Sequence, residues 1–178
     1  MSLTPGSRTL TPADGDLLLL TSVEGPMARL GHELALRGDI WNATVTIGDS
    51  AEATSLQATV DLTSLSVQGS RVPGKTVPEK DRGEILTHAQ KALQTQKHGQ
   101  ASFTSTAVRG DWNAVVVDGQ LTLHGQTRPQ SFRVETTGGG YRLSGQVTQS
   151  DYGIKPFAIM MGALKVGDVI DVEITVPL

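Results

Sequence analysis

The sequence predicts an all-β fold, an antiparallel barrel or sandwich, accompanied by one long helix. Apolar and polar residues alternate over most of the chain, which is the pattern of strands buried on one face. Turns rich in glycine and proline separate these segments. Apolar residues recur at helical three- and four-residue intervals over only one long stretch, residues 78–97. Many half-buried strands with a single helix are typical of a barrel or sandwich.

The clearest alternation lies in residues 113–134. One side of this stretch is apolar before a polar break, HGQTRP at 124–129, and the alternation resumes at Phe132 and Val134. Two alternating runs around a short polar break predict an antiparallel hairpin. The apolar residues before the break are Val115, Val117, Leu121 and Leu123.

Further alternating segments precede and follow this hairpin. They cover residues 33–39, 41–47, 56–62, 101–107, 141–147 and 170–176. The inward side changes parity between Ile40 and Trp41, which predicts a bulge or tight turn there. Residues 1–16 lack the pattern, so we expect a loose N-terminal lead-in followed by a single domain over residues 17–178.

Composition excludes several classes of function. A chain of 178 residues is long enough for one sizeable core, and a net charge of -3 gives no electrostatic footprint for nucleic acid. The absence of cysteine excludes disulfides and thiolate chemistry. The N-terminus shows no signal-peptide core, and the longest apolar run, residues 17–20, is too short to cross a bilayer. We therefore expect a soluble cytoplasmic protein without stable membrane insertion, or a secreted or periplasmic one if a leader was removed.

Several inward positions carry small residues. Such a position either borders unfilled volume or marks close packing by a neighbour, and the pattern allows both. Since an empty apolar cavity costs about 24 cal/mol per Å³, a large one is expected to bind a ligand. These positions are Ala43, Ala58, Ala101, Ser105, Ala107, Gly119 and Gly145.

Polar chemistry has few candidates. His32 and His124 are the main ones, with Asp151 as a carboxylate partner, but no spacing typical of a metal site or of a nucleophile motif accompanies them. We therefore predict no metal and no cofactor. Residues 152–164 are too apolar for a free loop, so they cover the core, line a pocket mouth or meet a partner.

Several motifs resemble those of the YceI-like family of lipocalin-like barrels. The hairpin GQLTLHGQTRP at 119–129 carries most of the resemblance, and SDYGI at 150–154, ASFTS at 101–105 and VGDVI at 166–170 add to it. GHEL at 31–34 and GALK at 162–165 look closest to an actinobacterial-type branch. The resemblance implies an antiparallel lipocalin-like β-barrel with one α-helix outside it, at about residues 78–97, and a role in binding polyisoprenoids and related lipid tails.

The resulting expectation is non-catalytic binding or transport of a long apolar or amphipathic molecule, such as a polyisoprenoid, an isoprenoid quinone or a fatty-acid-like lipid. One alternative is a small hydrolase or isomerase using His32 or His124. Another is a filled barrel that acts as a protein-interaction module, for instance as a homodimer. Residues expected to line the tube, shape its end or contact a polar head are Leu34, Leu36, Ala43, Ala58, Phe103, Leu121, Leu123, Phe132, Tyr141, Tyr152, Phe157, Met160, Met161, His32 and His124.

Overall fold

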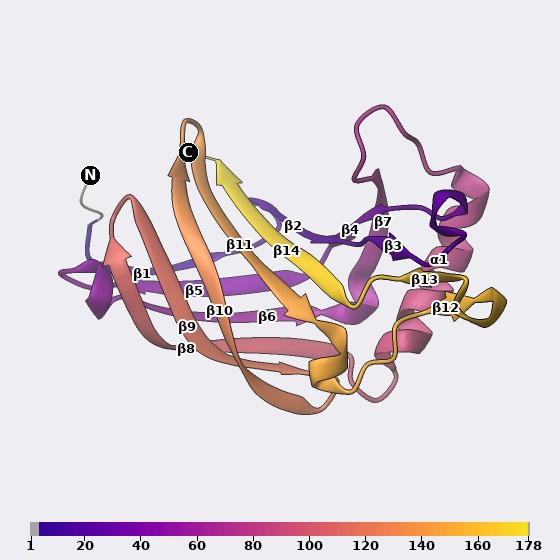
Figure 1. Cartoon of the computed structure of the whole chain (residues 1–178). Coiled ribbons are helices and arrows are strands. Elements are labelled where there is room, and N and C mark those ends of the chain that lie inside the picture. The colour runs from indigo at the N-terminus through magenta and orange to yellow at the C-terminus, as the bar shows by residue number, and fades with distance from the viewer. Residues whose placement is uncertain (1–3, 178) are drawn as a thin grey trace.

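The computed structural model describes residues 4–177 and shows a curled, eleven-stranded antiparallel sheet with one α-helix at its end (Figure 1). The alternation of the sequence becomes the two faces of this sheet, one apolar and turned inward, the other largely polar. The strands are β1 (Gly6–Leu10), β2 (Asp16–Leu20), β4 (Leu34–Gly38), β5 (Trp41–Ile47), β6 (Ser55–Asp61), β7 (Leu65–Ser70), β8 (Gln100–Asp111), β9 (Ala114–Leu123), β10 (Gln126–Thr137), β11 (Gly140–Thr148) and β14 (Val169–Pro177).

The order of the strands explains how the sheet curls into a half-barrel. The order is β1-β5-β6-β8-β9-β10-β11-β14-β2-β4-β7, so β5 and β6 lie near one end of the sheet and β4 and β7 at the other. Yet only Asp39 and Ile40 separate β4 from β5, and the short 3-10 helix η3 (Leu62–Ser64) alone separates β6 from β7. Two continuous segments therefore tie the two ends of the sheet together. The bend at Ile40 coincides with the predicted change of parity.

The central hairpin forms as predicted, with a tighter turn than the sequence suggested. Leu123 of β9 pairs directly with Gln126 of β10, so the loop contains only His124 and Gly125. Both have positive φ, 54° and 73°, as the two-residue turn of type I′ requires. The polar run after Gly125 belongs to β10 and does not interrupt the sheet.

The predicted loose lead-in over residues 1–16 is wrong for the described part. Residues 6–10 form β1, which pairs with β5 from Gly6 opposite Ile47 to Leu10 opposite Ala43. Residues 1–3 lie outside the described residues. β1 is an edge strand with a single partner and is mostly exposed, so its sequence shows no apolar alternation.

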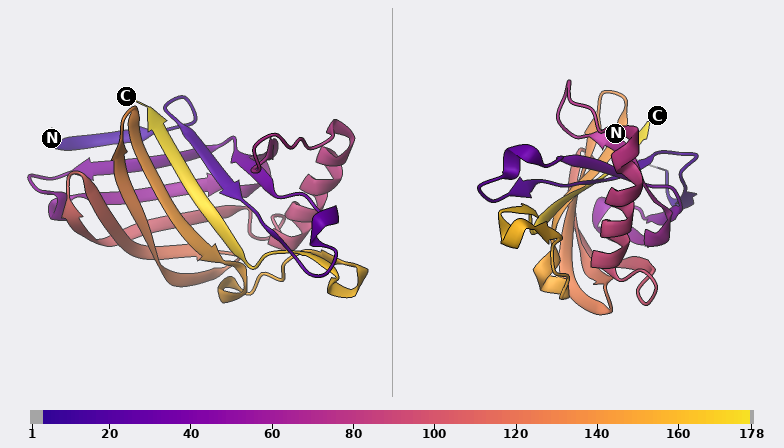
Figure 2. Two further views of the ribbon diagram at one scale, coloured as in Figure 1. Left: turned by 45° about the horizontal axis from the view of Figure 1, so that its top comes forward. Right: turned by 90° about the vertical axis from the view of Figure 1, so that its right-hand side faces the viewer.

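The predicted helix is α1 (Glu79–Leu93), which ends four residues earlier than expected. Gln94 adopts a left-handed conformation and its N–H bonds to the carbonyls of Gln90 and Lys91, which ends the helix. Figure 2 shows α1 lying outside the strands, across one end of the barrel. Among residues 4–177, no helix is long and apolar enough to cross a bilayer.

A small three-stranded sheet lies near α1 (Figure 1). Its strands are β3 (Val23–Glu24), β12 (Ala158–Ile159) and β13 (Leu164–Val166). Four further 3-10 turns, besides η3, complete the regular elements: η1 (Ala28–Leu30), η2 (Ala51–Ala53), η4 (Gln149–Tyr152) and η5 (Met160–Gly162).

Candidate functional site

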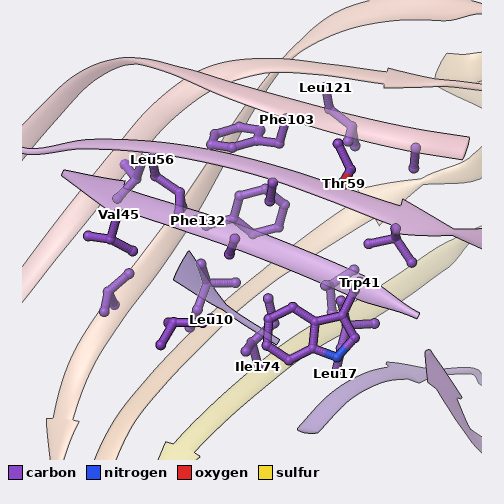
Figure 3. Close-up of a pocket in the computed structure, with 18 of the residues that line it drawn as sticks. Leu10, Leu17, Trp41, Val45, Leu56, Thr59, Phe103, Leu121, Phe132 and Ile174 are labelled. Atoms are coloured by element: carbon purple, nitrogen blue, oxygen red, sulfur yellow. The ribbon is translucent and has the colours of Figure 1, made fainter. Parts of the chain in front are cut away.

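An apolar cavity of about 400 Å³ occupies the interior of the half-barrel (Figure 3). Its wall comes from the inward face of nearly every strand of the main sheet, so the alternation of those strands builds it directly. Seven residues predicted to line a tube do line this cavity: Ala43, Ala58, Phe103, Leu121, Leu123, Phe132 and Tyr141.

The two ends of the cavity differ in chemistry. Leu93 at the end of α1 and Ile154 after η4 contribute apolar surface on the helix side. On the side of the β8–β9 and β10–β11 turns, the wall includes Trp112, the charged residue Glu135, and Arg8 of β1. The cavity therefore offers an apolar interior with charged groups only toward the end away from α1.

The predicted inward position of Ala107 is wrong, because a bulge between Ser105 and Ala107 shifts the register of β8 and leaves Ala107 exposed. Ser105 does not line the cavity either, and its hydroxyl oxygen accepts a hydrogen bond from the N–H of Leu56.

The other five small residues fall into two groups. Ala43, Ala58 and Ala101 border the cavity, as expected for positions that leave volume unfilled. Gly119 and Gly145 do not, because a Cβ on Gly119 would lie 2.5 Å from the ring of Phe103 and one on Gly145 would lie 2.5 Å from the ring of Phe132. These two glycines make room for aromatic rings.

Leu34 and Leu36 do not line the cavity, contrary to expectation. They face inward, since Leu36 lies directly opposite the cavity-lining Leu19. However, they form a separate apolar cluster with Val67 and Val77, and Ile85 and Leu86 of α1 pack against it. The helix therefore occupies the space that an inward position at this end would otherwise leave to a ligand.

The four residues expected to shape one end of the tube also lie outside the cavity wall. Tyr152 is almost completely buried in the main core. Phe157 stacks on His88 of α1, with ring centroids 4.1 Å apart. Met160 and Met161 are exposed at η5, where both have positive φ. None of the four belongs to the lining, although Ile154 of the same connection does.

The two predicted histidines have different neighbours, and neither of them lines the cavity. Nε2 of His32 is 3.5 Å from a carboxylate oxygen of Asp81 on α1, and both side chains are partly exposed. Nδ1 of His124 is 3.0 Å from the carbonyl oxygen of Tyr152, to which it donates because a carbonyl only accepts. Asp151, the proposed carboxylate partner, instead offers its backbone carbonyl to Nε of Arg128.

The histidine-based alternative therefore loses the shared pocket that it required. Over the described residues, no three histidine, aspartate or glutamate side chains gather in a way that could hold a metal ion.

Several residues of the cavity wall were not anticipated as site residues. Leu10 and Leu17 line it, but Leu10 was assigned to the lead-in. Trp41 lines it too and is only 3% exposed. The alternation of residues 41–47 places Trp41 on the inward side, and this pattern indicates a residue of the wall.

The groups with the clearest pKa shifts lie outside the cavity wall. Asp118 accepts hydrogen bonds from Nε of Arg109, 2.7 Å away, and from the hydroxyl of Ser131, which lower its pKa to about 2. Burial raises the pKa of Tyr152, and the nearby charge of Asp151 adds to this effect. Neither Asp118 nor Tyr152 lines the cavity.

The sequence pattern described as the YceI-like domain matches residues 21–178. The chain belongs to the YceI-like family. Among curated relatives, a UPF0312 protein of Shewanella baltica is 33% identical over 122 residues, which cover 64% of this chain and 58% of that protein. The YceI-like chain thus matches less than two thirds of the length of this relative.

Two solved structures share this fold. Burkholderia cenocepacia BcnA superposes with a TM-score of 0.65 at 16% identity, covering 91% of this chain and 94% of its own. A Campylobacter jejuni YceI protein gives a TM-score of 0.62 at 17% identity, covering 83% and 85%. At these identities the likeness shows the fold alone, a YceI-like barrel. The resemblance to an actinobacterial-type branch stays a prediction.

Proposed function

We propose that this YceI-like protein binds a long apolar or amphipathic molecule inside its barrel and does not transform it chemically. The observation that carries the proposal is the cavity of about 400 Å³, which lies within the range of small-molecule sites. A filled barrel that acts only through its surface would not retain such a volume, because unfilled apolar space destabilises a fold.

The chemistry of the wall supports an apolar ligand body. Leucine, valine, isoleucine and phenylalanine side chains from opposite strands face one another across the space, as Leu56, Phe132 and Ile174 do in Figure 3. Burying a hydrocarbon chain against such a surface gains roughly 25 cal/mol per Å² of apolar area removed from water. Lipid tails, including polyisoprenoids, the chains of isoprenoid quinones and fatty-acid-like lipids, fit this description.

The distribution of charge supports an amphipathic ligand. Arg8 and Glu135 lie toward the end of the cavity away from α1, and the side chain of Arg8 is 69% exposed. A polar head placed there keeps its contact with water, so it avoids the cost of burying an unpaired charge. The tail would then extend toward Leu93 of α1.

Mass spectrometry of an organic extract of the purified protein tests the proposal directly. We expect an apolar molecule in near-stoichiometric amount, or, for protein stripped of lipid, saturable binding of the neutral fluorescent probe N-phenyl-1-naphthylamine. Protein that carries no apolar molecule and binds no probe would contradict the proposal.

A pair of variants on β6 localises the site. Ala58→Phe fills the cavity from its wall and is expected to weaken probe binding at least tenfold. Gln57→Phe places the same side chain on the neighbouring, exposed position of the opposite face, and is expected to leave binding unchanged. If both variants bind the probe like the wild type, the ligand does not occupy this cavity.

A further inference from the structure

Exposed apolar side chains gather on two neighbouring loops of the protein. The described residues include six large apolar side chains that are exposed, and four of them belong to these two loops. The four are Leu30 of η1, Ile159 of β12, and Met160 and Met161 of η5, here called the methionine patch. An apolar patch of this kind typically marks a surface that contacts another molecule.

The small sheet holds the two loops together, although they lie far apart in the sequence. β3 pairs with β13, and the N–H of Met27 donates to the carbonyl of Ala163 over 2.9 Å. Both loops project from the end of the barrel at which α1 lies (Figure 2). The patch is therefore one continuous feature of that end.

The backbone at the centre of the patch is strained. Met160 and Met161 have φ of 55° and 57°, a left-handed conformation that is unfavourable for residues with a side chain. Pairing of Ile159 with Leu164 fixes the turn that contains them, and Met161 is fully exposed at its tip. Strain of this kind clusters at functional sites, and here it accompanies apolar exposure.

The charge around the patch is positive, although the whole chain has a net charge of -3. The segments that carry the patch, residues 25–31 and 153–166, contain three basic residues and no acidic one. The three are Arg29, Lys155 and Lys165, and all are exposed. Among the described residues, only Lys165 of these has an ion-pair partner, Glu24. Apolar tips flanked by cations are complementary to an anionic lipid surface.

We propose that the methionine patch docks the protein reversibly on a membrane that contains anionic lipids. The apolar side chains enter the boundary between headgroups and acyl chains, while the cations contact the headgroups. A second copy of the chain fits less well, because a symmetric pair would bring like charges together and lysine is depleted at protein interfaces. The inference goes beyond the proposed function, since it assigns a surface outside the cavity.

Flotation of the full chain with lipid vesicles tests the inference. We expect binding to vesicles of phosphatidylcholine and phosphatidylglycerol in equal parts, much weaker binding to phosphatidylcholine alone, and release at about 0.5 M sodium chloride, where screening is strong.

Matched variants locate the contact. Met161→Asp is expected to weaken vesicle binding about tenfold, and Arg29→Gln about fivefold, as expected for one cation near an anionic surface. Thr137→Asp adds the same charge as Met161→Asp at the exposed turn between β10 and β11, away from α1, and is expected to leave vesicle binding unchanged. Binding of N-phenyl-1-naphthylamine to the cavity should stay the same in Met161→Asp, because Met161 does not line it.

A second measurement covers the case in which Met161→Asp does not fold. The chain has no cysteine, so Met161→Cys and Thr137→Cys each provide a single site for a nitrobenzoxadiazole label. We expect anionic vesicles to shift the emission of the label at position 161 to the blue, as insertion into lipid requires, and to leave the label at position 137 unchanged.

The outcomes separate this inference from the proposed function, which probe binding measures independently. The inference is overturned if the wild type binds neither kind of vesicle, if it binds both equally, or if the label at position 161 does not respond. It is also overturned if Thr137→Asp weakens vesicle binding as much as Met161→Asp. A dimer found by sedimentation equilibrium, and dissociated by Met161→Asp, would instead make the patch an interface between copies of the chain.

Discussion

Phe103 and Phe132 meet edge to face inside the barrel, with ring centroids 5.1 Å apart and ring planes at 82°. They come from β8 and β10, which lie on either side of β9, so the pair spans β9. Aromatic pairs of this geometry contribute roughly 0.5–1.5 kcal/mol beyond the area they bury. Gly119 and Gly145 lie against the two rings, and the pair therefore depends on positions without a side chain.

We predict that Gly119→Ala destabilises the fold by about 1–3 kcal/mol, the usual cost of overpacking a core. The new methyl group would lie 2.5 Å from Cζ of Phe103 and would also meet the carbonyl of Thr104, a backbone atom that cannot move aside easily. Urea-induced unfolding measures the change. Gly138→Ala is the control, because nothing lies within 4 Å of that position. Equal stability of the two variants would show that the ring is not held where the structure places it.

We predict that Leu36→Ala costs about 2–5 kcal/mol of stability yet leaves probe binding intact in the folded protein. Leu36 is buried beneath Ile85 and Leu86 of α1 and does not line the cavity. Thermal unfolding and probe titration together check both parts. Leu30→Ala, at an exposed leucine, should stay within about 0.5 kcal/mol of the wild type. Weaker probe affinity in Leu36→Ala would show that Leu36 belongs to the binding site.

We predict that Tyr152→Phe leaves the free energy of unfolding unchanged or raises it, because the buried hydroxyl of Tyr152 has no hydrogen-bond partner. Burial raises the pKa of this phenol above 10.0, so the folded state holds the proton more tightly than the unfolded state. Its contribution to stability is therefore complete below pH 10 and decreases as the pH rises further.

Unfolding measured between pH 8 and pH 11 should accordingly show a shallower alkaline decline for Tyr152→Phe than for the wild type. Tyr141→Phe, at a partly exposed tyrosine, serves as the control. If the free energy of unfolding declined with the same slope in Tyr152→Phe and in the wild type, the pKa of Tyr152 would not differ between the folded and the unfolded state.

We predict that the carboxyl group of Asp118 titrates near pH 2 in the folded protein. The hydrogen bond from Arg109 is the main cause and that from Ser131 the second, so Arg109→Gln should raise this pKa toward 3.8. Because the folded pKa is the lower one, the interaction stabilises the protein above pH 3.8 and is lost as the pH falls toward 2. Carbon-13 NMR of the carboxyl group follows the titration.

Arg133→Gln is the control for this titration, since Arg133 pairs with Glu135 and not with Asp118. An unchanged midpoint in Arg109→Gln would show that the ion pair across β8 and β9 does not form in solution.

Much of the sheet could be predicted because alternation reports directly which side of a strand is buried. The parity change at Ile40 even located the bend between β4 and β5. Alternation does not report what covers the buried side, and this explains the errors. Leu36 faces inward but meets α1, and Gly119 faces inward but meets Phe103 across the strand pair. Only the folded arrangement separates contact with the helix from contact with a cavity.

The ties between β4 and β5 and between β6 and β7 have a consequence for ligand selection. Around most of the sheet, backbone hydrogen bonds hold neighbouring strands side by side. Between β4 and β5 the covalent connection through Asp39–Ile40 limits the circumference of the barrel, and between β6 and β7 the connection through residues 62–64 does the same. A guest that is too thick cannot be accommodated by parting the sheet there, so cross-section, more than length, should decide which molecules enter.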